Sequence, residues 1–345
     1  MSVRETWSAL RSLPLVPVWL RGLELGSTPN REIFRRGNLR LLEYEPAIDS
    51  VPQATPIVVI PSMINRHYIL DLLPGASFIE ALCLAGFTVY SLEWLQPHPS
   101  DRYLTIDELF TRRIDKALAV VAGRSPSGTF HLVGQCLGGT LAIVESLLRP
   151  ERVQTLTLMT TPVDFAQAGQ LGAWAQAPLD VEALTDAYGN IPSSLLQNSF
   201  KWLRPSLSLN KITKIAKRWR DEDFMRALLA LEMWSADNVD FPADCYRFLI
   251  EELYRGNKLS RGGLVVAGRS LDLEELRLPI FEAVAADDHI VPRTMRLPLL
   301  GSNPSIIRRD FKGGHLGAVI GGGARKTFWP ELVAWLKSHE SKRAS

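Results

Sequence analysis

The feature that constrains the fold most strongly is the alternation of short β-type runs with helical stretches. The run Ile57-Val58-Val59-Ile60 is β-branched throughout and favours a buried parallel strand. The stretch 39–44 alternates apolar and polar residues, which predicts a half-exposed edge strand. Further strands are predicted at 87–92, 130–133, 153–159, 280–285 and 306–311, and helices at 77–84, 105–121, 141–148 and 327–339. Such alternation predicts an α/β fold with a mostly parallel sheet covered on both faces.

One stretch, between Pro162 and about Gly262, breaks this rhythm. It shows helical patterns, several tryptophans and no convincing strand. We therefore expect a helical cap at 163–262, inserted into a core made of 38–162 and 263–345 and preceded by an N-terminal segment at 1–37. Ligands of α/β enzymes bind beyond the carboxyl ends of the strands, so a cap placed there would cover the active site.

Composition excludes several classes of protein. The 345 residues are 46% hydrophobic, which is enough for a substantial core. The 39 Lys and Arg residues nearly balance the 37 Asp and Glu residues, so nucleic acid is not expected as a partner. Prolines and arginines interrupt the moderately apolar stretch from Trp7 to Leu25, whereas a membrane span needs roughly 20 apolar residues. We therefore expect a cytoplasmic protein.

The three cysteines, Cys83, Cys136 and Cys245, bear on redox state and metal binding. They are too few and too scattered for a disulfide framework. None belongs to a Cys-x-x-Cys or Cys/His pattern that would hold zinc. We expect reduced thiols and no metal site.

The segment 130–140 reads as a strand, a sharp turn and a helix, with Cys136 at the turn. Gly134 and Gly138 flank Cys136 at a distance of two, which is the pattern of a nucleophile elbow and is typical of the α/β-hydrolase fold. The dipole of the following helix would favour a thiolate. A lone cysteine is more often an ordinary buried thiol, but the strand before it and the helix after it favour a nucleophile.

Partners for such a nucleophile should follow in the order acid, then histidine, each in a loop after a strand. Asp288 follows one predicted strand and His315, between glycines, follows the next. We therefore expect His315 to act as general base and Asp288 to orient it. Asp287 is the rival acid and His289 the rival base. Both expected residues could instead be ordinary turn or solvated residues.

Acyl chemistry at Cys136 would also need two N–H donors for an oxyanion. The elbow supplies the backbone amide of Leu137. The loop after the strand at 57–60 should supply the second, for which we choose Ile64, with Met63 as the next choice. Asn65 either helps to position the loop or substrate, or is a turn-forming asparagine.

Six segments of the chain stand out as motifs. They are Asn65-Arg66-His67-Tyr68-Ile69-Leu70-Asp71-Leu72, Gly134-Gln135-Cys136-Leu137-Gly138-Gly139, Thr161-Pro162-Val163-Asp164-Phe165, Gly189-Asn190-Ile191-Pro192, Asp288-His289-Ile290-Val291-Pro292 and Gly313-Gly314-His315-Leu316-Gly317. In this order they resemble motifs of the catalytic subunit of polyhydroxyalkanoate synthases, most closely the short, two-component type. The likeness runs from about Asn38 to Trp335 and is weak before Asn38, and Glu93-Trp94 stands where the family usually has Asp-Trp.

This resemblance implies an acyltransferase that polymerises (R)-3-hydroxyacyl groups from coenzyme A thioesters into a storage polyester. The family's nucleophile, acid and histidine fall on Cys136, Asp288 and His315. The acyl group would pass through a cysteine thioester, and coenzyme A would arrive with the substrate, so no separate cofactor is implied. Implied partners are the growing polyester chain, the surface of a polyester granule in the cytoplasm, and a second synthase subunit or a second copy of this chain.

Two other functions fit parts of the pattern. A cysteine-type hydrolase, such as a polyester depolymerase, a thioesterase or a relative of dienelactone hydrolase, could use the same triad. The long helical insertion and the additional motifs favour the synthase. A non-catalytic granule scaffold with the same fold should have lost a triad member, and none is lost here.

Two groups of residues in the predicted cap have a structural and a functional interpretation. The first is a basic stretch that is either a solvated helix face or a site for coenzyme A phosphates or a granule surface. The second is a set of tryptophans that either packs in the core or lines an acyl tunnel or subunit contact. The basic stretch comprises Lys211, Lys214, Lys217, Arg218 and Arg220, and the tryptophans are Trp174, Trp202 and Trp234.

Overall fold

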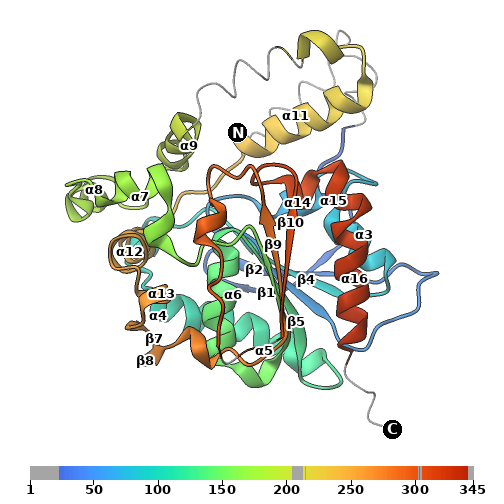
Figure 1. Cartoon of the computed structure of the whole chain (residues 1–345), viewed down its shortest axis with the longest axis horizontal. Helices are drawn as coiled ribbons and strands as arrows, with labels where there is room; N and C mark the ends of the chain where they lie inside the picture. Colours follow the sequence, from blue (N-terminus) through green and yellow to red (C-terminus); the bar gives the residue numbers. More distant parts are fainter. Residues whose placement is uncertain (1–22, 204–212, 214, 302, 304, 341–345) are drawn as a thin grey trace.

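The computed structural model describes residues 23–203, 213, 215–301, 303 and 305–340, with an eight-stranded sheet at its centre (Figure 1). The strands lie in the order β1-β2-β4-β3-β5-β6-β9-β10. From β4 to β10 neighbouring strands are parallel, whereas β2 is antiparallel to both β1 and β4. The bounds are β1 Arg31–Arg36, β2 Leu39–Tyr44, β3 Ile57–Ile60, β4 Val89–Trp94, β5 Phe130–Gln135, β6 Val153–Met159, β9 Ile280–Ala285 and β10 Ile306–Phe311. The predicted mostly parallel sheet is confirmed.

The strand predicted at 39–44 is present as β2, but its prediction as an edge strand is wrong. β1 pairs with β2 on its outer side, and every residue of β2 except Arg40 is buried. An ion pair, and not solvent exposure at an edge, explains the polar residue Arg40 in this strand. Its Nη2 lies 2.6 Å from Glu93 Oε2 on the neighbouring strand. Since β1 falls within the predicted N-terminal segment 1–37, the sheet begins before the predicted core boundary.

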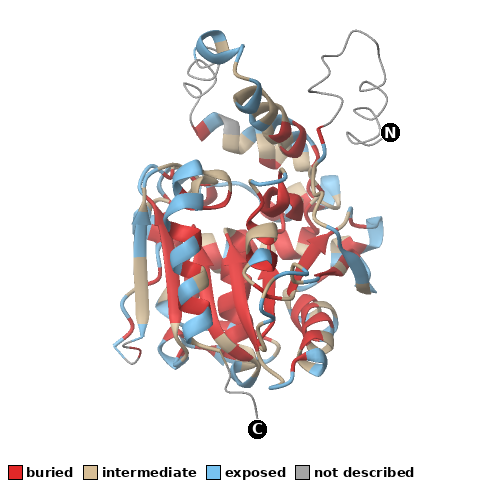
Figure 2. Cartoon of the chain, turned by 90° about the vertical axis from the view of Figure 1, so that its right-hand side faces the viewer, coloured by how far each residue is buried: buried red, intermediate tan, exposed pale blue. Residues whose placement is uncertain are grey.

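Helices cover both faces of the sheet because successive residues of its strands point to opposite sides. Val58 and Ile60 pack in one apolar layer with α5 and α6, while Ile57 and Val59 pack in the other with α3 and α16. Figure 2 shows the buried strands between these layers. The four predicted helices are present as α3 Phe78–Leu84, α4 Ile106–Glu108 continued by the π-helix η3 Leu109–Ile114 and α5 Asp115–Arg124, α6 Leu137–Leu148, and α16 Phe328–Ser338.

The chain between β6 and β9 forms the helical insertion. Its described part within 163–262 contains helices and two isolated bridges but no strand. The helices include the 3₁₀ helix η5 Phe165–Gln167, α7 Gly169–Gln176, α8 Val181–Tyr188, α9 Ser193–Leu203, α11 Glu222–Ala236, α12 Ala243–Phe248, the π-helix η6 Leu249–Arg255 and α13 Lys258–Arg261. In Figure 1 α9 and α11 lie beyond one end of the sheet, whereas α12 and α13 lie beside it, near α4 and α6. A short hairpin, β7 Leu264–Val266 with β8 Arg269–Leu271, follows and was not predicted. The division into core and cap stays a prediction.

Candidate active site

Cys136 occupies the turn between β5 and α6, as the glycine spacing predicts. Its backbone has φ 53° and ψ −129°, a conformation that residues with a side chain rarely adopt. The flanking glycines permit this turn, since a Cβ on Gly134 would lie 2.3 Å from Gly139 Cα and one on Gly138 would lie 2.1 Å from Ile60 O. The turn presents a half-buried sulfur at the first residue before a helix.

We predict that Gly138→Ala destabilises the protein by about 3 kcal/mol or more, because the added methyl group would meet backbone atoms of β3 and its loop rather than a flexible side chain. Chemical unfolding of the variant measures this. Gly123→Ala is the matched control, since Gly123 lies in α5 with no atom within 4 Å of an added Cβ. The control should be neutral or slightly stabilising. Equal stability of the two variants would contradict the proposed close packing.

Asp288 and His315 meet at the carboxyl ends of β9 and β10. His315 Nδ1 lies 2.8 Å from Asp288 Oδ2. The other carboxylate oxygen accepts hydrogen bonds from the backbone amides of Ile290 (2.8 Å) and Val291 (2.9 Å). The Asp288 side chain is fully buried, whereas Asp287 is exposed. The structure therefore places the expected acid, and not its rival, beside the histidine.

The electrostatics of His315 connect it to Cys136. Burial by itself lowers the pKa of His315, but the charges of Cys136 and Asp288 and their hydrogen bonds to the ring outweigh burial and raise this pKa to about 10. An imidazolium is thus favoured between a carboxylate and a sulfur. The three side chains lie together as the sequence predicts.

We predict that the His315 ring stays doubly protonated at pH 8 and that Cys136→Ala lowers its titration midpoint. Removal of the sulfur takes away one of the groups that raise the His315 pKa, while Asp288 remains. Nuclear magnetic resonance of the protein with labelled histidine measures both midpoints. Solvated His98, which lies outside this site, serves as the internal control. A midpoint near 6.5 in both proteins would contradict the coupling.

Two neighbours of the site were not foreseen. Thr160, at the end of β6, has φ 45° and donates from its hydroxyl to the His315 carbonyl (3.3 Å). Tyr254 lies in the π-helix η6, and burial followed by the charge of Cys136 raises its pKa. Neither carries a local sequence signal, because a threonine after a strand and a tyrosine at helical spacing are ordinary core residues.

The loop after β3 carries the predicted second oxyanion donor and contacts the elbow. Gly138 packs against Ile60 and Pro61 carbonyl oxygens, and Trp94 Nε1 donates to Pro61 O at 3.0 Å. The Ile64 amide donates to Ser62 Oγ at 3.4 Å, a long and therefore weak bond. The structure thus brings the loop to the elbow, and the roles of the Ile64 and Leu137 amides stay predictions.

Asn65 joins the loop to the helical insertion rather than closing a local turn. Its side-chain amide donates to Asn238 Oδ1 at 2.8 Å, and the two residues also form an isolated antiparallel bridge. This contact favours a role in holding the loop. Contact between Asn65 and substrate stays a prediction.

A small apolar cavity of about 20 Å³ lies beside the elbow. Its lining includes Leu137, Met63 of the loop after β3, and Phe241, Phe248 and Leu253 of the insertion. The insertion therefore contributes apolar side chains next to the first residue of α6. Such an apolar lining favours contact with hydrocarbon groups.

The two other groups singled out in the insertion are largely solvent-facing. Lys211 and Lys214 lie outside the described residues, and Lys217, Arg218 and Arg220 are exposed. Trp202 is 70% exposed and Trp174 37% exposed, whereas Trp234 is 6% exposed. Core packing is thus confirmed only for Trp234.

Neither a metal-binding group nor a membrane-spanning helix is found in the described part of the chain. No group of three or more His, Cys, Asp and Glu side chains there could hold a metal ion. No helix there is both long and apolar enough to cross a membrane.

Two protein-family models match the chain. One, described as the N-terminus of poly-beta-hydroxybutyrate polymerase (PhaC), matches residues 19–82. The other, the alpha/beta hydrolase fold, matches residues 55–319 and thus more than half of the chain. Because the first match begins at residue 19, the prediction that the likeness begins at about Asn38 is wrong.

Curated relatives described as poly(3-hydroxyalkanoate) polymerase subunits match most of the chain. The poly(3-hydroxyalkanoate) polymerase subunit PhaC of Allochromatium vinosum is 31% identical over 319 residues, covering 91% of this chain and 90% of the relative. The subunit of Thiocystis violacea is 30% identical over 321 residues, covering 91% and 89%. The subunit of Haloferax mediterranei is 32% identical over 318 residues, and the match covers 91% of this chain but 64% of that longer relative.

Solved structures bear on the fold alone because their sequences are distant. A soluble variant of monoglyceride lipase from Saccharomyces cerevisiae has a TM-score of 0.55 at 11% identity, with 93% of this chain and 98% of that one covered. A thermophilic esterase from Thermogutta terrifontis has a TM-score of 0.53 at 13% identity, with 91% and 100% covered. The predicted α/β-hydrolase fold is confirmed.

Proposed function

Because the chain belongs to the PhaC family of poly(3-hydroxyalkanoate) polymerases, within the alpha/beta hydrolase superfamily, we propose that Cys136 carries the acyl group as a thioester during polymerisation. The enzyme acts as an acyltransferase on (R)-3-hydroxyacyl coenzyme A. The observation that carries the proposal is the meeting of Cys136, His315 and Asp288 at the elbow. Lipases share this fold, so the fold alone would not distinguish transfer from hydrolysis.

The first step loads the cysteine. His315 has taken the proton of the Cys136 thiol and holds it as an imidazolium, and the thiolate sulfur attacks the thioester carbonyl of the substrate. The amides of Leu137 and Ile64 stabilise the oxyanion that forms. The bond from the carbonyl carbon to coenzyme A then breaks, and the leaving sulfur receives the proton from His315. A thioester is exchanged for a thioester, so the acyl group stays activated.

The second step extends the polyester. The hydroxyl of another hydroxyacyl unit attacks the Cys136 thioester and gives its proton to His315, with help from Asp288. A carbon–oxygen bond forms and the carbon–sulfur bond breaks, which restores the Cys136 thiolate beside the protonated His315. Water would compete as the nucleophile, and the helical insertion, with its apolar side chains beside α6, supports exclusion of water.

Partners follow from the same activity. The growing chain must leave the site, so the protein is expected at the surface of a polyester granule in the cytoplasm. A second synthase subunit, or a second copy of this chain, completes the working enzyme. The relatives are themselves described as subunits.

The test is to incubate the purified full chain with (R)-3-hydroxybutyryl coenzyme A, with and without a candidate partner subunit. Thiol release and polymer are followed together. We expect both to appear, with the amount of thiol matching the units in polymer. Free hydroxy acid without polymer would overturn the synthase assignment in favour of a thioesterase.

A further inference from the structure

The loop between β3 and the 3₁₀ helix η1 (His67–Asp71) is held on its core side by β4. Trp94 of β4 donates from Nε1 to Pro61 O at the start of the loop. At the end of the loop, Arg66 Nη1 lies 3.4 Å from both Trp94 O and Glu93 Oε1. β4 thus contacts both ends of the segment that carries Ile64.

The insertion holds the same loop from the other side. Trp234, near the end of α11, donates from Nε1 to Arg66 O at 2.9 Å. Asn65 donates to Asn238 at 2.8 Å. The two residues directly after Ile64 are therefore hydrogen-bonded to the last turn of α11 and to the chain that follows it.

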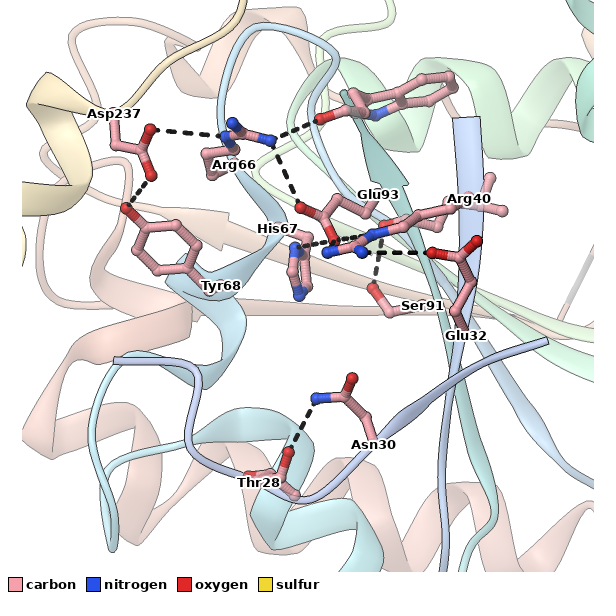
Figure 3. Close-up of polar contacts among 12 residues, drawn as sticks. Thr28, Asn30, Glu32, Arg40, Arg66, His67, Tyr68, Ser91, Glu93 and Asp237 are labelled. Atoms are coloured by element: carbon pink, nitrogen blue, oxygen red, sulfur yellow. Dashed lines mark hydrogen bonds and ion pairs between the residues drawn. The ribbon is translucent and has the colours of Figure 1, made fainter. Parts of the chain in front are cut away.

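Figure 3 shows the Arg66 guanidinium between Glu93 of β4 and Asp237 of the insertion, with dashed lines to both. Its Nη1 faces Glu93, while its Nε lies 3.7 Å from Asp237 Oδ1. That Nε is buried and makes no hydrogen bond. The ion pair with Asp237 therefore offsets part of the cost of burying its charge. Tyr68 donates to the other oxygen of Asp237 at 2.8 Å and fixes the carboxylate.

We propose that Arg66 is a positioning residue that sets the Ile64 amide according to the position of the segment 234–238. Movement of α11 would reach the guanidinium through Asp237 and the backbone through Trp234 and Asn238. The loop would then carry the Ile64 amide toward or away from the oxyanion. This inference rests on the proposed function, because it assumes acyl chemistry at Cys136.

Removal of the Arg66 side chain should leave the fold intact, because each side chain that it contacts keeps another interaction partner. Glu93 retains Arg40 at 2.6 Å and His67 at 3.4 Å. Asp237 retains Tyr68. Trp234 donates to the Arg66 main chain, which any variant keeps.

The experiment compares two reactions of the same sulfur in Arg66→Ala and Arg66→Lys. Acylation by (R)-3-hydroxybutyryl coenzyme A passes through an oxyanion, whereas alkylation by iodoacetamide does not. We expect the kcat for thiol release to fall about 10- to 100-fold in Arg66→Ala with KM within about threefold. Alkylation of Cys136 should stay within about twofold, and Arg66→Lys should recover part of the loss because it keeps the charge.

Two matched controls separate this role from general loosening. Arg40→Ala removes the other arginine on Glu93 without a contact to α11. Gln96→Ala removes a different link to the insertion, the 2.7 Å bond to Asp240. Both should keep kcat within about threefold. In addition, Arg66→Ala/Asp237→Asn should lose no more than Arg66→Ala alone.

The outcomes distinguish the two proposals. Equal losses of acylation and alkylation in Arg66→Ala, or an unchanged kcat, would overturn the positioning role. A different result would overturn the proposed function instead. In that result iodoacetamide also labels another cysteine of the wild-type protein, and thiol release continues after Cys136 has been alkylated.

Discussion

Cys136→Ala is expected to lower thiol release from (R)-3-hydroxybutyryl coenzyme A by about 10⁴-fold or more and to abolish polymer. The substitution removes the sulfur at the elbow that we propose as the acceptor of the acyl group. Electrophoretic or mass-spectrometric detection of the acyl-enzyme gives a second measurement. The wild-type protein should gain one acyl mass at Cys136, and the variant should gain none.

Cys83→Ala is the matched control for this loss. Burial raises the pKa of the Cys83 thiol to about 12, so this cysteine stays protonated and unreactive. Its variant should release thiol within about twofold of the wild-type rate. Cys136→Ser tests the carrier role separately, since an oxygen ester would lose the activation that the next transfer needs. Undiminished polymer formation by Cys136→Ala would remove Cys136 from the mechanism.

The elbow was predictable from the sequence because its signal is local. Gly134, Cys136 and Gly138 fall within five positions, and backbone sterics alone require small residues on both sides of the strained turn. Asp288 and His315 lie far from Cys136 in sequence, yet the topology places the ends of parallel strands at one edge. Prediction of the triad needed only the order of the strands that these loops follow, not the detailed packing of the loops.

The network around Arg66 could not be predicted, because its contacts join distant parts of the chain. Trp234 donates to a residue 168 positions away. The sequence shows Glu93 only as a replacement for the aspartate usual in the family, whereas in the structure His67 and Arg40 outweigh its burial and lower its pKa to about 2. No periodicity or spacing marks such pairs. β1 was missed for a similar reason, since its polar, exposed sequence gains strand character only from pairing with β2.

Asp288→Asn should lower thiol release by about 10³- to 10⁴-fold while leaving the fold intact. One carboxylate oxygen accepts two backbone amides, from Ile290 and Val291, so the oxygen of an introduced asparagine would stay there. Its NH₂ group would then face His315 Nδ1 and require a lone pair on that atom. The ring proton would move to Nε2, and His315 could no longer accept the proton of the Cys136 thiol.

Asp287→Asn is the control for this prediction, because Asp287 is adjacent but exposed. Thermal unfolding should give both variants midpoints close to the wild-type value, while only Asp288→Asn loses activity. Loss of the carboxylate should also lower the His315 titration midpoint, since Asp288 is one of the groups that raise it. A near-wild-type rate in Asp288→Asn, or an equal loss in Asp287→Asn, would assign the acid to another residue, and an unchanged His315 midpoint would show that the 2.8 Å contact does not govern the ring.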